Sequence, residues 1–129
     1  PLQLAKAYAI ISNGGFDIEP SLIKSELKNY QQKKRIIKAG ISEKINAMLR
    51  KIVTTKEGTA GLVNIEGYEV GGKTGTAQKT IVGGYSKAKI NTFAGIFPAS
   101  NPKYVLIVLL DEPKTSSDYI KFRKYKDHI

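Results

Sequence analysis

The stretch Gly71–Gln78 constrains the fold of this chain more than any other part of its sequence. It combines a lysine, two threonines and three glycines within eight residues. In an extended backbone, Thr74 and Thr76 share one face of the strand, and Lys73 and Gly75 share the other. Glycine inside a strand often marks the close approach of a ligand or another backbone. We therefore expect a sheet edge whose N–H groups, hydroxyls and ammonium can hold an extended peptide ending in a carboxylate.

The hydrophobic pattern predicts an α+β fold built on an antiparallel sheet. Strands are expected near residues 68–79, 92–97 and 104–110, and helices near residues 2–12 and 43–55. The short connection between the last two strands implies antiparallel pairing. The last strand is a continuous apolar run, which is typical of a strand buried on both faces.

Local signals refine the ends of these elements. Asn13-Gly14-Gly15 is expected to end the first helix in a left-handed turn, and Ser42 is expected to cap the N-terminus of the second. A flexible loop is expected from Gly83 to Lys89. The second helix should bury one stripe on the sheet, formed by Ile45, Met48, Leu49, Ile52 and Val53.

The composition excludes several functions. The net charge is +10, but only three of the 21 basic residues are arginine, so we expect a lysine-rich solvated surface and no specific nucleic-acid binding. The chain has no cysteine, and we expect neither a metal site nor a cofactor. No apolar run approaches the roughly 20 residues of a membrane span, so any membrane anchor is expected outside this chain. A non-catalytic basic binding module remains an alternative.

Lys73–Thr76 reads Lys-Thr-Gly-Thr, which resembles the third active-site motif of the penicillin-binding transpeptidases. Pro1–Gly15 before it, and Phe93–Ala99 and Asn101–Lys114 after it, fit the same family in the same order. The chain therefore resembles the C-terminal part of the transpeptidase domain of class B penicillin-binding proteins, closest to the cell-division type.

The resemblance implies an organisation and a setting. Residues 1–114 would be the C-terminal segment of a partial penicillin-binding/β-lactamase-like transpeptidase domain, and residues 115–129 an atypical basic tail. The parent protein would be a serine D,D-transpeptidase that cross-links peptidoglycan stem peptides in cell division and binds β-lactams. It would act on the periplasmic side of the bacterial inner membrane, held there by an N-terminal anchor.

The resemblance also assigns roles to individual residues. Lys73 would supply positive charge and hydrogen bonds to the proton-transfer network. The hydroxyls of Thr74 and Thr76 would hold the carboxylate of the substrate or of a β-lactam. The backbone N–H of Thr76 would form half of the oxyanion hole. Gly75 would let the substrate peptide lie against the strand.

The chain offers no convincing nucleophile. Three Ser-x-x-Lys strings occur, at Ser21–Lys24, Ser86–Lys89 and Ser100–Lys103, and none opens a convincing buried helix. No Ser-x-Asn string is present. We therefore expect the acylated serine to lie outside this chain and the chain alone to be inactive. Half a domain should expose apolar surface, so we also expect it to associate with itself or with the missing part of the domain.

A rival interpretation involves different chemistry. Gly67–Thr74 also fits the phosphate-loop pattern, and Asp111-Glu112 after an apolar strand would suit the magnesium site of an ATPase. A phosphate loop must open a helix, whose N-terminal N–H groups hold the anion. Gly75 and the glycines near residue 83 disfavour such a helix.

Overall fold

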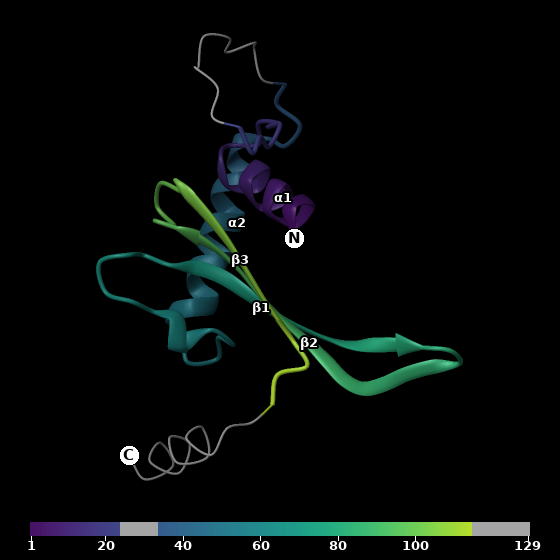
Figure 1. Ribbon diagram of the computed structural model, residues 1–129. Coiled ribbons are helices and arrows are strands. Elements are labelled where there is room, and N and C mark those ends of the chain that lie inside the picture. The colour runs from purple at the N-terminus through teal and green to yellow at the C-terminus, as the bar shows by residue number, and fades with distance from the viewer. Residues whose placement is uncertain (24–33, 115–129) are drawn as a thin grey trace. The chain divides into compact units, whose positions relative to one another are not determined.

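The computed structural model describes residues 1–23 and 34–114 of the chain. The string Ser21–Lys24 therefore lies partly outside the described residues, and the basic tail from residue 115 lies wholly outside them. In chain order the elements are α1 (Leu2–Ser12), α2 (Ala39–Thr54), the short 3-10 helix η1 (Gly61–Val63), β1 (Gly71–Ile81), β2 (Gly84–Phe97) and β3 (Tyr104–Asp111) (Figure 1).

The predicted α+β fold is confirmed. The three strands form one antiparallel sheet in the order β1-β2-β3, so β2 is central and β1 is an edge strand. The chain divides into two compact units. The first comprises Pro1–Gly75 and Thr92–Leu109, and the second comprises Thr76–Asn91 with the described residues from Leu110 onward. None of the described helices is long and apolar enough to cross a membrane.

Helix α1 matches its predicted span and ends where the glycines predict. Gly14 and Gly15 both adopt left-handed backbone conformations, with φ of 88° and 87°. At Gly15 the need for glycine is also steric, because a Cβ there would lie 1.9 Å from the carbonyl oxygen of Ile37. The turn therefore places the end of α1 directly against the segment that leads into α2.

The prediction that Ser42 caps the second helix is wrong. Helix α2 begins at Ala39 with Lys38 as its N-cap, so Ser42 lies inside the helix and is only 1% exposed. Its hydroxyl donates to the carbonyl oxygen of Ile11 and accepts from the N–H of Gly14, 3.1 Å away. The hydroxyl thus satisfies backbone groups at the end of α1, a tertiary role that outweighs its local capping propensity.

The predicted apolar stripe on α2 is mostly present. Leu49 and Val53 are buried, but Met48 is 60% exposed and does not join them. The stripe is completed instead by two buried polar residues, Ser42 and Asn46. The buried face of α2 is therefore shifted slightly around the helix from the predicted apolar stripe. Polar residues fit there because the neighbouring surface of α1 offers polar backbone groups as well as apolar side chains.

The predicted flexible loop from Gly83 to Lys89 is wrong. This segment begins β2, which pairs with β1 as a hairpin through the two-residue turn Val82-Gly83 (Figure 1). Gly83 has a φ of +86°, a left-handed conformation that glycine adopts without steric cost. Tyr85, Lys87 and Lys89 are exposed and alternate with less exposed residues. This period-two pattern was hidden in the sequence by the run of glycines.

The first unit has its core on one face of the sheet. Leu49 of α2, Ile96 of β2 and Ala99 are buried together, with Tyr8, Ile45, Ile52 and Val105 packed around them. Gly71 permits a close approach between α2 and β1, because a Cβ there would lie 3.1 Å from the backbone nitrogen of Arg50. Both helices therefore contribute to covering this face.

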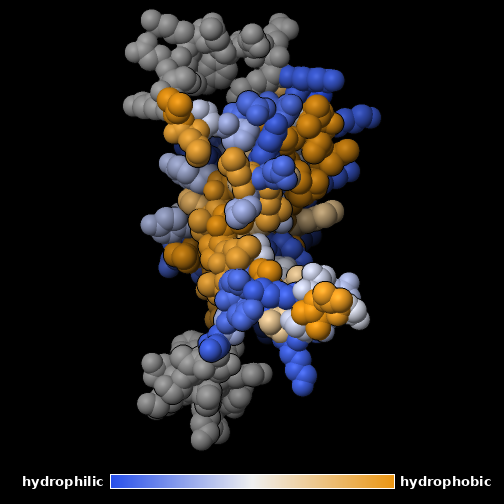
Figure 2. Space-filling view, turned by 45° about the vertical axis from the view of Figure 1, so that its right-hand side comes forward, coloured by the Kyte–Doolittle hydropathy of each residue, from blue (hydrophilic) through white to orange (hydrophobic). Residues whose placement is uncertain are grey.

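The opposite face of the sheet is open within the described residues, so the prediction that β3 is buried on both faces is wrong. Leu106 and Val108 are 47% and 40% exposed. They line an apolar cleft of about 370 Å³ together with Val63, Ile65, Tyr68, Val70, Phe93, Gly95 and Phe97. Figure 2 shows hydrophobic side chains at the surface of the described residues. We call these nine residues the open apolar face.

Candidate functional site

Lys73 and Thr74 lie in the first half of β1, at the edge of the sheet. The Lys73 side chain is exposed, and its Nζ donates to the carbonyl oxygen of Thr74 at 2.6 Å. The structure thus places an ammonium group beside a strand that has no hydrogen-bonded neighbour on its outer side among the described residues. Thr76 continues β1 in the second unit and is exposed.

The three glycines of this stretch serve different purposes. A Cβ at Gly72 would lie 2.5 Å from Cζ of Phe93 and 2.7 Å from the carbonyl oxygen of Ala94, so this glycine is required by packing within the sheet. At Gly75, in contrast, a Cβ would meet no atom within 4 Å. The space beside Gly75 is therefore open to an extended ligand.

Sequence reasoning missed Thr59 as a neighbour of this strand. The hydroxyl of Thr74 donates to the hydroxyl of Thr59 at 2.9 Å. Thr59 is positioned by a turn after α2, in which Gly58 approaches so closely that a Cβ would lie 2.0 Å from the carbonyl oxygen of Ile52. Gly58 was a local signal of a tight turn, but nothing in the sequence indicated which strand the turn would contact.

The phosphate-loop alternative is not supported. Lys73 and Thr74 lie in a strand, and no helix begins after them among the described residues, so the N-terminal N–H groups that hold phosphate are missing from this position. In the second unit, Asp111 and Glu112 are both paired with Nζ of Lys79, each at 2.7 Å. The described residues contain no group of three or more potential metal ligands among His, Cys, Asp and Glu.

The Ser-x-x-Lys strings within the described residues do not open helices. Ser86 lies inside β2, and Ser100 lies in the turn between β2 and β3. Ser100 donates its hydroxyl hydrogen to a carboxylate oxygen of Glu69. Neither serine therefore has the setting of a helix-borne nucleophile beside a lysine.

The chain was compared with known families and with curated relatives. The model of the penicillin binding protein transpeptidase domain matches residues 1–127. A probable peptidoglycan D,D-transpeptidase PenA from Neisseria flavescens is 35% identical over 120 residues, covering 92% of this chain and 29% of the relative. A peptidoglycan D,D-transpeptidase FtsI homolog from Mesostigma viride is 35% identical over 134 residues, covering 88% and 22%.

Solved structures resemble this fold closely. The transpeptidase domain of penicillin-binding protein 3 from Burkholderia pseudomallei has a TM-score of 0.81 and 32% identity, covering 91% of this chain and 35% of that one. Penicillin-binding protein 3 from Mycobacterium tuberculosis, complexed with aztreonam, has a TM-score of 0.76 and 27% identity, covering 99% and 35%.

The family model, the curated relatives and the solved structures all match most of this chain, and all are penicillin-binding or peptidoglycan transpeptidase proteins. The chain spans less than a third of the length of either curated relative. The family model nevertheless covers almost the whole chain, and the structural neighbours share its helices and sheet. The chain therefore belongs to the penicillin-binding protein transpeptidase family.

Proposed function

We propose that this chain provides the carboxylate-binding strand of a penicillin-binding D,D-transpeptidase that cross-links peptidoglycan during cell division. The observation that carries this proposal is the position of Lys73–Gly75 in the edge strand of the sheet, with open space beside Gly75. An edge strand with free backbone groups can pair with an extended peptide. The family membership supports the proposed reaction, and the name of the FtsI homolog supports the proposed cellular process.

The roles follow the family motif residue by residue. Lys73 contributes positive charge to the proton-transfer network, and the hydroxyls of Thr74 and Thr76 hold the substrate carboxylate. The N–H of Thr76 donates to the oxyanion, a contact worth about 3 kcal/mol of transition-state stabilisation in comparable sites. Gly75 keeps the strand accessible. The Thr74 hydroxyl has a single hydrogen, which it donates to Thr59 in this structure, so it would exchange Thr59 for the carboxylate when the substrate binds.

In this proposal the acylated serine is supplied from outside the chain. Residues 1–114 form a segment of the transpeptidase domain and residues 115–129 a basic tail with four basic and two acidic residues, although the family model extends to residue 127. The parent protein acts on the extracytoplasmic side of the bacterial inner membrane. It takes peptidoglycan stem peptides as substrates and β-lactams as inhibitors.

Labelling with a fluorescent penicillin tests these assignments. The isolated chain should not be labelled, whereas the parent protein should be. In the parent, Thr74→Val should slow acylation by about tenfold or more, because it removes one hydroxyl hydrogen bond to a charged carboxylate. Thr80→Val, a change of the same chemistry further along β1, is the matched control and should leave the rate unchanged. Labelling of the isolated chain, or equal effects of the two variants, would refute the assignments.

The same proposal has a consequence for assembly. The open apolar face exposes Leu106 and Val108, and contiguous apolar surface of this kind favours association. We expect the isolated chain to form dimers or larger assemblies, or to bind the rest of its domain. Light scattering at high protein concentration tests this expectation. A monomer that does not bind the remaining part of the domain would contradict it.

A further inference from the structure

A pair of hydroxyl groups joins the turn after α2 to the edge strand β1. Oγ1 of Thr74 lies 2.9 Å from Oγ1 of Thr59, although the two residues are 15 positions apart in the chain. Each hydroxyl carries one hydrogen and can also accept a hydrogen bond, so a pair at this distance can be bonded in either direction. The Thr59 hydroxyl has no further hydrogen-bond partner among the described residues, so its own hydrogen is available to Thr74.

The turn that carries Thr59 is fixed to the end of α2 on both sides of this residue. The N–H of Gly58 donates to the carbonyl oxygen of Thr55 at 3.1 Å, and the N–H of Ala60 donates to that of Ile52 at 3.4 Å. Ala60 is only 4% exposed. The Thr59 side chain is therefore exposed to solvent, but the backbone that carries it is held in place.

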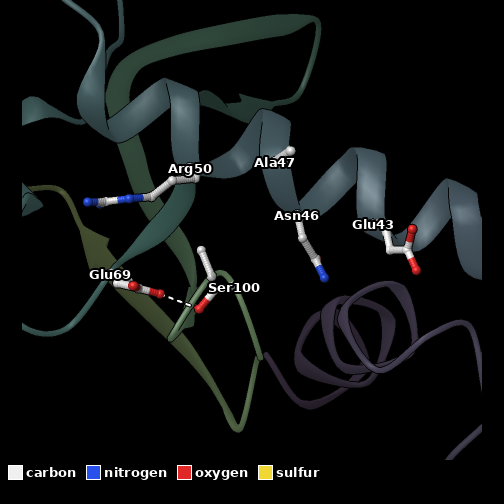
Figure 3. A pocket seen from close by; sticks show the side chains of 7 residues that line it. Glu43, Asn46, Ala47, Arg50, Glu69 and Ser100 are labelled. Carbon is white, nitrogen blue, oxygen red and sulfur yellow. Dashed lines mark hydrogen bonds between the residues drawn. The ribbon is translucent and has the colours of Figure 1, made fainter.

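The residue before β1 is fixed to the same helix. Nη1 of Arg50 donates to the carbonyl oxygen of Val70 at 2.7 Å. Figure 3 shows the extended Arg50 side chain projecting from α2. Because the turn and the strand are both anchored to α2, the fold itself sets the distance between the hydroxyls of Thr59 and Thr74.

The hydroxyl pair acquires a role when a carboxylate binds. Thr74 then donates its single hydrogen to the carboxylate and can no longer donate to Thr59. The pair stays bonded if Thr59 turns its own hydrogen toward Oγ1 of Thr74. In the resulting chain both hydroxyls donate in the direction of the anion, and hydrogen bonds linked in this way polarise and strengthen one another. No proton is transferred, because only the two hydroxyl hydrogens rotate.

We propose that Thr59 is a positioning residue for the transpeptidase reaction, which holds the Thr74 hydroxyl in place and donates to it once the carboxylate is bound. This role rests on the proposed function, in which Thr74 holds the carboxylate of the substrate or of a β-lactam. It extends the carboxylate-binding strand to the turn after α2. Thr59 influences the substrate only through Thr74.

Acylation of the parent protein by a fluorescent penicillin tests this role. Thr59→Val preserves the size of the side chain and removes its hydroxyl. It should slow acylation by about three- to fivefold, less than Thr74→Val, because it weakens the donor to the carboxylate without removing it. Thr59→Ser keeps the hydroxyl and should be acylated nearly as fast as the unsubstituted protein.

Thr55→Val provides the matched control, because it removes a hydroxyl from the same turn. The Thr55 hydroxyl donates to the carbonyl oxygen of Lys51 at 2.9 Å and not to β1. This variant should be acylated at the unchanged rate. Equal slowing by Thr55→Val and Thr59→Val would reveal a general disturbance of the turn and overturn the positioning role.

A double substitution separates positioning from an independent effect on the fold. Because Thr59 acts through the Thr74 hydroxyl, Thr59→Val should cause no further slowing when Thr74→Val is already present. The same slowing in both backgrounds, or slowing by Thr59→Ser as large as that by Thr59→Val, would overturn the positioning role. An unchanged rate in Thr59→Val beside a slowed Thr74→Val would overturn it too, and would leave the proposed function intact. An unchanged rate in Thr74→Val would instead refute the proposed function, and the positioning role with it.

Discussion

The two faces of the sheet in the first unit differ in what covers them. On one face, Ile96 is completely buried by residues of α1, α2 and β3. On the other, Leu106 and Val108 remain about half exposed although both are as apolar as the core residues. Hydrophobicity along a strand therefore predicts which residues are suited to burial. It does not predict which of them the same chain can bury.

Removing a core side chain from the covered face should have the largest effect. Ile96→Ala should lower the free energy of unfolding by about 3 kcal/mol, because it leaves a cavity among Leu49, Ala99 and their neighbours. Leu106→Ala on the open apolar face should cost less than about 1 kcal/mol at protein concentrations low enough to keep the chain monomeric. Urea unfolding followed by circular dichroism measures both. Equal losses would mean that the open apolar face is covered in solution.

The buried hydroxyl between the two helices should rank second. Ser42→Ala should cost about 2 kcal/mol, since it leaves the N–H of Gly14 and the carbonyl oxygen of Ile11 without their partner. Ser21→Ala is the matched control at an exposed site and should change stability by less than about 0.5 kcal/mol. The same unfolding experiment compares them. A loss no larger than that of the control would show that water replaces the hydroxyl.

Two glycines of β1 allow a finer test of the open apolar face. Gly72→Ala should cost about 1–2 kcal/mol, because its Cβ would press on the ring of Phe93 and on the backbone of Ala94. Gly75→Ala should be neutral or slightly stabilising, since glycine is unfavourable in a strand and no atom obstructs the new methyl group. Thermal unfolding of the two variants measures the difference. A neutral Gly72→Ala would show that Phe93 can move outward on its uncovered side.

The smallest effect is expected in the second unit, whose described residues include two ion pairs of Lys79 but no buried hydrophobic side chain. Hydrogen bonds from Lys79 to Asp111 and then to Glu112 raise the pKa of Lys79 above its ordinary value of 10.5. Because the folded pKa is the higher one, this contribution to stability is fully present below pH 10.5 and is lost as the pH rises through the folded pKa. NMR titration of the Lys79 side chain, in the folded chain and in urea, measures the shift.

Asp111→Asn serves as the control for this titration, because it removes the partner with the largest influence on Lys79. The titration midpoint of Lys79 should move back toward that of the unfolded chain. If the titration midpoint of Lys79 in the folded unsubstituted chain does not exceed the midpoint in urea, both ion pairs are too weakly formed in solution to shift its pKa.

The sequence predicted well the features that are encoded locally. Helix α1, its glycine stop, the strand at Lys73–Thr76 and the antiparallel order all follow from periodicity and turn chemistry. The errors share a different cause. Ser42 does not cap α2, because its hydroxyl binds the backbone of α1. The start of β2 at Gly84 was missed, because the glycines there masked the alternation of the strand.

The candidate functional residues also fall into those encoded locally in the sequence and those determined by tertiary contacts. The motif at Lys73–Thr76 could be read from four consecutive residues, but its neighbour Thr59 could not, because a hydrogen bond across 15 positions leaves no trace in spacing. The buried amide of Asn46 was equally hidden. Asn46 lies on the buried side of an amphipathic helix, where the pattern indicates packing, and its unpaired oxygen becomes apparent only from the surrounding backbone.

The absence of a side chain at Gly71 has a mechanical consequence. With 3.1 Å between the position of a Cβ and the backbone of Arg50, helix and strand meet main chain to main chain, without a compressible layer between them. Lys73 follows only two residues later. The backbone of β1 at Lys73 is therefore tied to the position of α2, and a ligand or mutation that tilts this helix would shift the backbone of Lys73 without touching it.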